Sequence, residues 1–116
     1  MDRLKLLIKP LACRKNKVYA DRDMISPDTA PKNLSEEALK AIKSLADDII
    51  EARENKRSVM LTFGAHTIKN GMAPTLIAML ERGFFTHYAT NGAGIIHDWE
   101  VAYQGRTSED VRANVC

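Results

Sequence analysis

The sequence predicts an α/β fold with an open parallel sheet whose elements follow in the order β-α-β-α. Two nearly continuous apolar runs, residues 58–63 and 84–90, have the length of strands, and each is followed by a glycine-containing segment. Runs of this kind are typical of parallel strands that are buried on both faces. A helical pattern follows each run, as an open α/β sheet requires. An amphipathic helix and an irregular basic arm precede this unit.

The first 34 residues are predicted to form an irregular basic arm. They carry eight Lys or Arg and four Asp, which gives this segment a charge of +4 in a chain whose total is +2. Residues 4–8 and 17–20 each fit a short strand, and residues 26–31, with two prolines, are typical of turn and loop. A basic patch that meets nucleic acid is one interpretation of the arm. A solvated arm that packs on another part of the molecule is favoured, because the net charge is too small to indicate nucleic acid.

Residues 35–54 are predicted to form an amphipathic helix. Ser35 is a suitable N-cap because its hydroxyl can accept from a free backbone N–H, and Glu36 and Glu37 suit the positive end of the helix dipole. Apolar side chains recur at 3.6-residue spacing and form one stripe, which consists of Ala38, Leu39, Ile42, Leu45, Ala46, Ile49, Ile50 and Ala52. This stripe predicts packing against a sheet or another helix.

Residues that typically begin or end helices predict the remaining elements. Pro74 suits the first turn of a helix that continues to Arg82 and stops at Gly83. Another helix is predicted over about residues 95–103, ending at Gly105. Residues 106–111 are predicted to be a loop that leads into a further helix, with Thr107 or Ser108 as its N-cap.

Length, apolar content and cysteine spacing limit the class of protein to which the chain can belong. With 116 residues the chain has room for one small domain. No apolar run reaches the roughly 18 residues of a membrane span, and the N-terminus lacks a secretory core. Cys13 and Cys116 lie near the two ends without metal-type spacing, which predicts two free thiols in a reducing cytoplasm.

Two loops directly after the predicted strands hold the candidate functional residues. They span residues 64–71 and 90–98. In a parallel α/β sheet, ligands bind outside the carboxyl ends of the strands, where glycines admit a ligand close to the backbone and the next helix offers N–H groups to an anion. The turn over residues 91–94 therefore fits a phosphate- or dinucleotide-binding turn, and it fits a tight connection without a ligand equally well. We accordingly predict that residues 35–116 form a partial nucleotide-binding domain.

Titratable side chains accompany both loops at the same edge. These are His66, Lys69, His97, Asp98 and Glu100. A zinc site built from His66, His97, Asp98 and Glu100 would indicate a metal-dependent hydrolase. This alternative is weakened because the sequence has no HExxH motif and no paired His or Cys spacing.

From Gly64 to about Tyr103 the sequence resembles deoxyhypusine synthase, and within that family a bacterial branch. The family pattern is a Ser-Asn-Leu-Ile-Ser-Ser-Gly loop, a helix, a hydrophobic strand, then Thr-Ala-Gly-Gly and an acidic run that ends in Asp. The positions that match without gaps are Ile68 and Gly71 in the first loop and Thr90, Gly94 and Asp98 in the second.

The resemblance implies a partial Rossmann-like parallel sheet that binds NAD, in a homotetramer with sites between paired subunits. It further implies transfer of an aminobutyl group from a polyamine to an amine acceptor. We take His97 and Asp98, two titratable residues of the second loop, as the catalytic candidates. The residues that would line the dinucleotide are Ala65, His66, Thr67, Asn91, Gly92, Ala93, Gly94 and Asp98.

The sequence departs from the family pattern at three loop positions and in one larger feature. His66 replaces an asparagine, and Ile96 and His97 replace acidic residues. The catalytic lysine of the family lies far beyond these loops, and no lysine here matches it. We therefore expect a truncated piece of the family's chain, or a chain whose activity is lost or resides elsewhere. The alternative from another class is a non-catalytic α/β subunit, and since two strands are seldom stable alone, association is expected.

Overall fold

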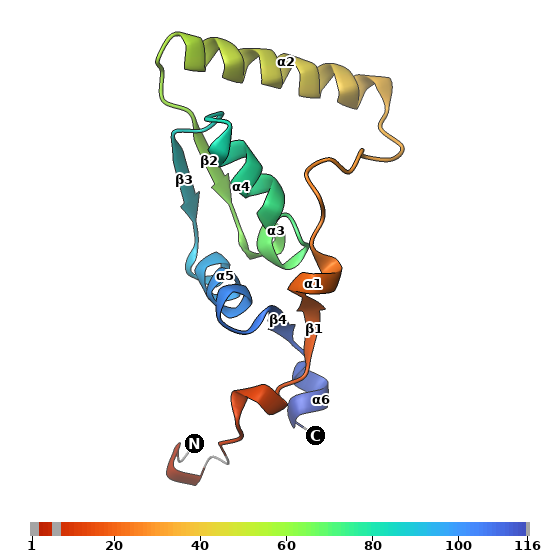
Figure 1. The fold of residues 1–116 in the computed structure, drawn as a ribbon, viewed down its shortest axis with the longest axis vertical. Helices are drawn as coiled ribbons and strands as arrows, with labels where there is room; N and C mark the ends of the chain where they lie inside the picture. Colours follow the sequence, from red (N-terminus) through yellow and green to blue (C-terminus); the bar gives the residue numbers. More distant parts are fainter. Residues whose placement is uncertain (1–2, 6–7, 116) are drawn as a thin grey trace.

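The computed structural model describes residues 3–5 and 8–115 and has a mixed α/β fold with two separate two-stranded sheets (Figure 1). One sheet is the parallel pair β2 (Met60–Phe63) and β3 (His87–Thr90). The other is the antiparallel pair β1 (Asn16–Tyr19) and β4 (Arg106–Glu109). The predicted parallel pair is thus confirmed, with both strands shorter than their apolar runs.

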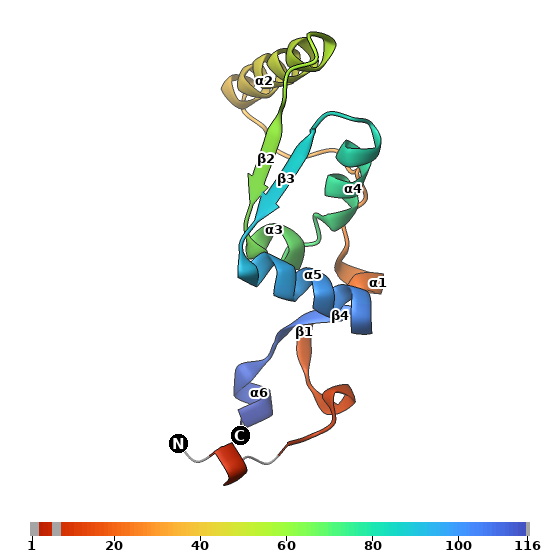
Figure 2. The same ribbon diagram turned by 90° about the vertical axis from the view of Figure 1, so that its left-hand side faces the viewer.

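The two parallel strands end side by side. Their register runs from Met60 opposite His87 to Phe63 opposite Thr90, so the next residues of both strands leave the sheet at one edge. At that edge the chain enters α3 (Ala65–Lys69) after β2 and α5 (Gly92–Gln104) after β3, as Figure 2 shows. The crossover between the strands is completed by α4 (Ala73–Glu81), which has Pro74 in its first turn as predicted.

Both loops at this edge are more helical than predicted. Residues 65–69 form a one-turn helix, α3, where a loop was expected. The helix predicted from about residue 95 begins at Gly92, because the Asn91 side chain accepts a hydrogen bond from the backbone N–H of Gly94 at 2.9 Å. It ends, as predicted, at Gly105, which adopts a left-handed φ of 66°.

The prediction of a loop at residues 106–109 is wrong. This segment is β4, with Val18 of β1 opposite Thr107. The four residues of β4 contain no apolar side chain, so neither alternation nor an apolar run marks them as a strand. The helix expected after it is present as α6 (Val111–Val115), but Asp110 caps it: its carboxylate accepts from the Ala113 N–H at 3.1 Å.

The arm contains less strand than predicted. Residues 3–5 form a 3₁₀ turn, η1 (Arg3–Lys5), so the strand expected at residues 4–8 is wrong for residues 4 and 5. It is also wrong for Ile8, which lies in no strand, and residues 6 and 7 lie outside the described part of the chain. A second 3₁₀ turn, η2 (Leu11–Cys13), precedes β1, and the short α1 (Ala20–Asp23) follows it. The strand expected at residues 17–20 is confirmed for residues 17–19 as β1, whereas Ala20 already belongs to α1. The pairing of β1 with β4 joins the arm to the C-terminal part of the chain.

The predicted amphipathic helix is confirmed as α2 (Glu36–Glu54), with the Ser35 hydroxyl accepting from the Ala38 N–H at 3.1 Å. It lies across one end of the molecule in both ribbon views. The expected packing is only partial. Ala46, Ile49 and Ile50 line a hollow with Met79, Phe84 and Phe85, whereas no residue of α2 is buried and Leu45 remains 61% exposed.

The hydrophobic core of the described chain is small. Ile68 is its one buried apolar side chain. The radius of gyration is 18.4 Å, against about 13 Å for a compact domain of this length. The accessible surface is 9199 Å², whereas a compact protein of this mass exposes about 6,300 Å². Residues 3–5 and 8–115 include no helix with the length and apolar character to cross a bilayer.

Candidate functional site at the ends of the parallel strands

The two predicted loops meet at the carboxyl ends of β2 and β3. A Cβ added to Gly64, the N-cap of α3, would lie 3.8 Å from the side-chain amide nitrogen of Asn91, the N-cap of α5. Ala65, His66 and Thr67 form the first turn of α3, where His66 is exposed. The first turn of α5 supplies Gly92, Ala93 and Gly94. The structure therefore brings the candidate dinucleotide-lining segments to one edge.

The two glycines of the second loop have different surroundings. Gly94 is buried, and a Cβ there would overlap the Thr90 hydroxyl, so packing of α5 on the end of β3 already requires glycine. Gly92 is exposed, and a Cβ there would meet no atom within 4 Å. Close approach of a ligand to the backbone is thus open at Gly92 and closed at Gly94.

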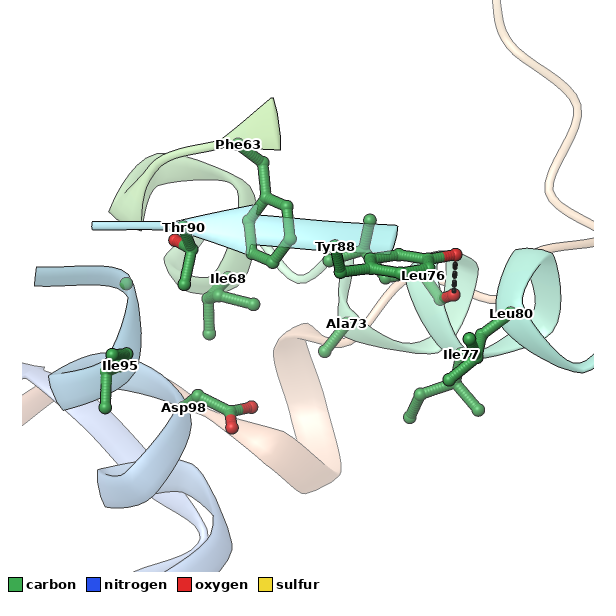
Figure 3. Close-up of a pocket in the computed structure, with 11 residues that line it drawn as sticks. Phe63, Ile68, Ala73, Leu76, Ile77, Leu80, Tyr88, Thr90, Ile95 and Asp98 are labelled. Atoms are coloured by element: carbon green, nitrogen blue, oxygen red, sulfur yellow. Dashed lines mark hydrogen bonds between the residues drawn. The ribbon is translucent and has the colours of Figure 1, made fainter. Parts of the chain in front are cut away.

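A largely apolar pocket of about 310 Å³ lies beside this edge (Figure 3). Its walls come from the end of β2, from α3, from α4, from β3 and from the first turns of α5, and Asp98 supplies its carboxylate. The lining residues are Phe63, Ile68, Ala73, Leu76, Ile77, Leu80, Tyr88, Thr90, Gly94, Ile95 and Asp98. Tyr88 donates its hydroxyl to the Leu76 carbonyl oxygen at 3.2 Å, and burial raises the pKa of this phenol. The volume is at the lower end of the range for small-molecule sites.

The two catalytic candidates lie on different sides of α5. Asp98 lines the pocket, whereas the His97 ring contacts β4: its Nδ1 lies 2.6 Å from the Thr107 hydroxyl. The same hydroxyl donates to Glu100 Oε2 at 2.5 Å, and the other oxygen of Glu100 pairs with Arg14 Nη1 at 2.7 Å. His97, Thr107, Glu100 and Arg14 therefore form one continuous polar chain, which we call the relay cluster.

The relay cluster is shielded from water. Thr107 is fully buried, and the side chains of Glu100, Arg14 and His97 are 13%, 18% and 20% exposed. Burial raises the pKa of the Glu100 carboxyl, but hydrogen bonds from Arg14 and Thr107 outweigh burial and hold the pKa below its ordinary value. Glu100 is therefore an ionised acceptor at neutral pH.

Sequence reasoning missed Arg14 and Thr107 as parts of a site. Arg14 lay in the basic arm, and Thr107 was expected to cap a helix. Arg14 precedes β1 and Thr107 lies within β4, so the antiparallel pairing brings both beside α5. A strand signal in residues 106–109 would have been needed to find them, and these polar residues carry none.

The zinc alternative requires a clustering of ligands that the described residues do not have. Among residues 3–5 and 8–115, no three His, Cys, Asp or Glu side chains are placed so that they could hold one metal ion. His97 and Glu100 approach each other, with Nδ1 3.9 Å from Oε2, but this pair belongs to the relay cluster. Cys13 is a free, exposed thiol.

Comparisons with known proteins give no match. No protein-family model matches the chain, no curated protein sequence is significantly similar to it, and no solved structure resembles it significantly. Proposals about function therefore depend on the residues and their geometry.

Proposed function

We propose that the chain is the NAD-binding part of a deoxyhypusine-synthase-like transferase, with the dinucleotide held at the carboxyl edge of the β2–β3 pair. The observation that carries this proposal is the meeting of the two strand-end loops at one edge. The parallel pair would then be part of a Rossmann-like sheet, and ligands of such sheets bind at this edge.

The first turn of α5 supplies the groups that suit a pyrophosphate. The 13 residues of α5 are long enough to present a helix N-terminus with N–H groups that favour an anion. Gly92 is exposed and has open space beside its backbone, which allows a phosphate to approach closely. Gly94 serves the fold instead, since its space is taken by Thr90.

The neighbouring pocket suits the second substrate of such a reaction. Its lining is mainly aliphatic and aromatic, and Asp98 offers one carboxylate, which is the arrangement that an alkyl chain with a terminal ammonium group would bind. A polyamine or a related aliphatic amine is the substrate class that follows. We expect Asp98→Asn to weaken amine binding in calorimetric titrations.

Association into a homo-oligomer belongs to the same proposal. The accessible surface exceeds that of a compact chain by about 2,900 Å², and each partner of an obligate homodimer buries about 1,000–2,500 Å². A second copy of the chain would cover apolar surface that the fold leaves exposed. The alternative of a non-catalytic α/β subunit shares this association and differs in having no NAD site.

Titration with NAD tests the proposal. Trp99 is the single tryptophan and stacks on Tyr103 within α5, so its fluorescence reports on the helix that would hold the pyrophosphate. We expect a saturable change in Trp99 emission and a rise in melting temperature with NAD. No change at millimolar NAD would leave the non-catalytic subunit as the better interpretation.

A Gly92→Val variant sharpens the test. A Cβ there would meet no atom within 4 Å, so we expect the fold to be kept while the approach of a phosphate is blocked. We expect NAD affinity to fall by at least about tenfold, the equivalent of about 1.4 kcal/mol. The matched control is Ala102→Val, an exposed position on the same helix away from the strand ends, which should bind NAD as the parent does.

A further inference from the structure

The proton positions in the relay cluster can be deduced from its geometry. A threonine hydroxyl has one proton to donate, and Thr107 Oγ1 has two close partners, Glu100 Oε2 and His97 Nδ1. An ionised carboxylate only accepts, so the hydroxyl proton points to Glu100. His97 Nδ1 must then carry the proton that it shares with the Thr107 oxygen.

The second ring nitrogen of His97, Nε2, is consequently free to accept a proton. His97 Nε2 makes no hydrogen bond with any described residue. A buried atom without a partner would be an orphan, and His97 Nε2 is not one of these, so it reaches solvent. In the neutral ring with Nδ1 protonated, Nε2 holds the lone pair. A ligand N–H or O–H can therefore transfer its proton to Nε2, and the imidazolium that forms would lie 3.9 Å from the Glu100 carboxylate.

We propose that Glu100 and Thr107, anchored by Arg14, are positioning residues that hold His97 with Nδ1 protonated and leave Nε2 open to solvent as a proton acceptor. The tautomer is a property of the free protein, so this proposal does not rest on the proposed function. The Glu100 carboxylate acts through the Thr107 hydroxyl on Nδ1 of His97 and so fixes the orientation of the ring. In catalytic triads a carboxylate fixes the histidine ring at the same nitrogen.

Arg14 fixes the direction of the whole chain of hydrogen bonds. Its Nη1 binds Glu100, while Nε and Nη2 are buried without a partner among the described residues, so the guanidinium has an unmet need for acceptors. A glutamine at position 100 would therefore turn its amide oxygen toward Arg14. This makes Glu100→Gln an informative variant, because its amide has one acceptor and one donor end.

Long-range ¹H–¹⁵N correlation spectra of the imidazole rings test the proposal, because they distinguish the two tautomers. The chain has three histidines, and His66→Gln and His87→Gln variants assign the signals of His97 by elimination. At mildly alkaline pH we expect the wild-type His97 to carry its proton on Nδ1. A proton on Nε2 in the wild type would overturn the proposal without any variant being needed.

In Glu100→Gln the amide oxygen faces Arg14 and the amide N–H₂ donates to Thr107, so the hydroxyl proton is redirected to His97 Nδ1. We expect the tautomer to invert, with the proton now on Nε2. Thr107→Ser keeps the hydroxyl and should retain the wild-type tautomer. If Glu100→Gln keeps its fold by circular dichroism and the tautomer is unchanged, Glu100 does not orient His97.

The NAD titration and the measurement of the His97 tautomer test different claims, so one can give a negative result without the other. The tautomer is measured in the free protein, so absence of NAD binding leaves the spectra of His97 unaltered. A wild-type ring with Nε2 protonated, in contrast, removes the proton acceptor and leaves NAD binding untouched.

Discussion

At the scale of single residues, Gly94 is constrained by the end of β3. An added methyl group would overlap the Thr90 hydroxyl, and the backbone N–H of Gly94 is held by Asn91, so the helix cannot easily shift away. We expect Gly94→Ala to lower the free energy of unfolding by about 1–3 kcal/mol, the usual range for overpacking. Urea denaturation followed by circular dichroism would measure this change.

The matched control for Gly94 is a double variant. Thr90→Ala removes the overlapping hydroxyl, so Thr90→Ala/Gly94→Ala should recover more than half of the lost stability relative to Thr90→Ala alone. No recovery would show that the clash with Thr90 is not the reason for glycine at this position.

The Asp23 carboxylate predicts a specific acid sensitivity. Hydrogen bonds from Arg22 and from the Tyr19 N–H lower the pKa of Asp23 from 3.8 to about 2. Because this pKa is lower in the folded than in the unfolded chain, the ionised carboxylate contributes stability above about pH 4, and the contribution is lost as the pH falls toward about 2. Asp23→Asn should therefore be less stable than the parent at neutral pH and should lose less stability on acidification.

Urea midpoints at neutral pH and at about pH 3 would measure this difference. Asp28→Asn is the control, because Asp28 is an exposed carboxylate in the same arm whose side chain makes no hydrogen bond among the described residues. An acid response of Asp23→Asn equal to that of the parent would contradict the role of the carboxylate at Tyr19.

At the scale of elements, the contact of the arm with the α3–α4 connection depends on Gly71. Gly71 is buried with φ 83°, its carbonyl oxygen accepts from the Ile25 N–H at 2.9 Å, and a Cβ there would overlap the Asp23 carbonyl. We expect Gly71→Ala to be destabilising by more than the roughly 1–2 kcal/mol of left-handed strain alone, because backbone rather than a flexible side chain stands in the way.

Gly83 provides the matched control for Gly71. It has a similar φ of 70°, but a Cβ there meets no atom within 4 Å. Gly83→Ala should therefore report the strain alone, and the difference between the two variants in urea denaturation should report the docking of residues 23–25. Equal losses in both variants would show that the arm does not pack against Gly71.

Elements with a local hydrophobic pattern were predictable, whereas β4, which has none, and its pairing with β1 were not. The stripe and N-cap of α2 and the apolar runs of β2 and β3 are local signals. β4 is polar throughout and exists because it pairs with β1, about 90 residues earlier in the chain, and α3 is too short to show a period. The site followed the same division: the loops after β2 and β3 were found, whereas Arg14 and Thr107 depended on the β1–β4 pair.

At the scale of the whole molecule, the extended shape sets the chain apart from a compact domain. The described residues span 58 × 31 × 24 Å, and α2 lies across one end with little covering it (Figures 1 and 2). Large apolar side chains on α2 remain substantially exposed: Leu39, Ile42, Leu45 and Ile50. Contiguous exposed apolar surface of this kind is typical of a surface that another chain covers.

We expect the chain to associate through the apolar stripe of α2, so that Leu45→Glu weakens the assembly. Leu45 is 61% exposed, and no residue of α2 is buried, so the substitution does not disturb the fold of one chain but would place a charge in a covered interface. Light scattering after gel filtration should give a multiple of 13.0 kDa for the parent and a shift toward 13.0 kDa for Leu45→Glu. Lys43→Glu, on the polar face of the same helix, alters charge without touching the stripe and should keep the parent's mass. A parent that stays monomeric at high concentration would contradict assembly through α2, and the exposed stripe would then need a different explanation.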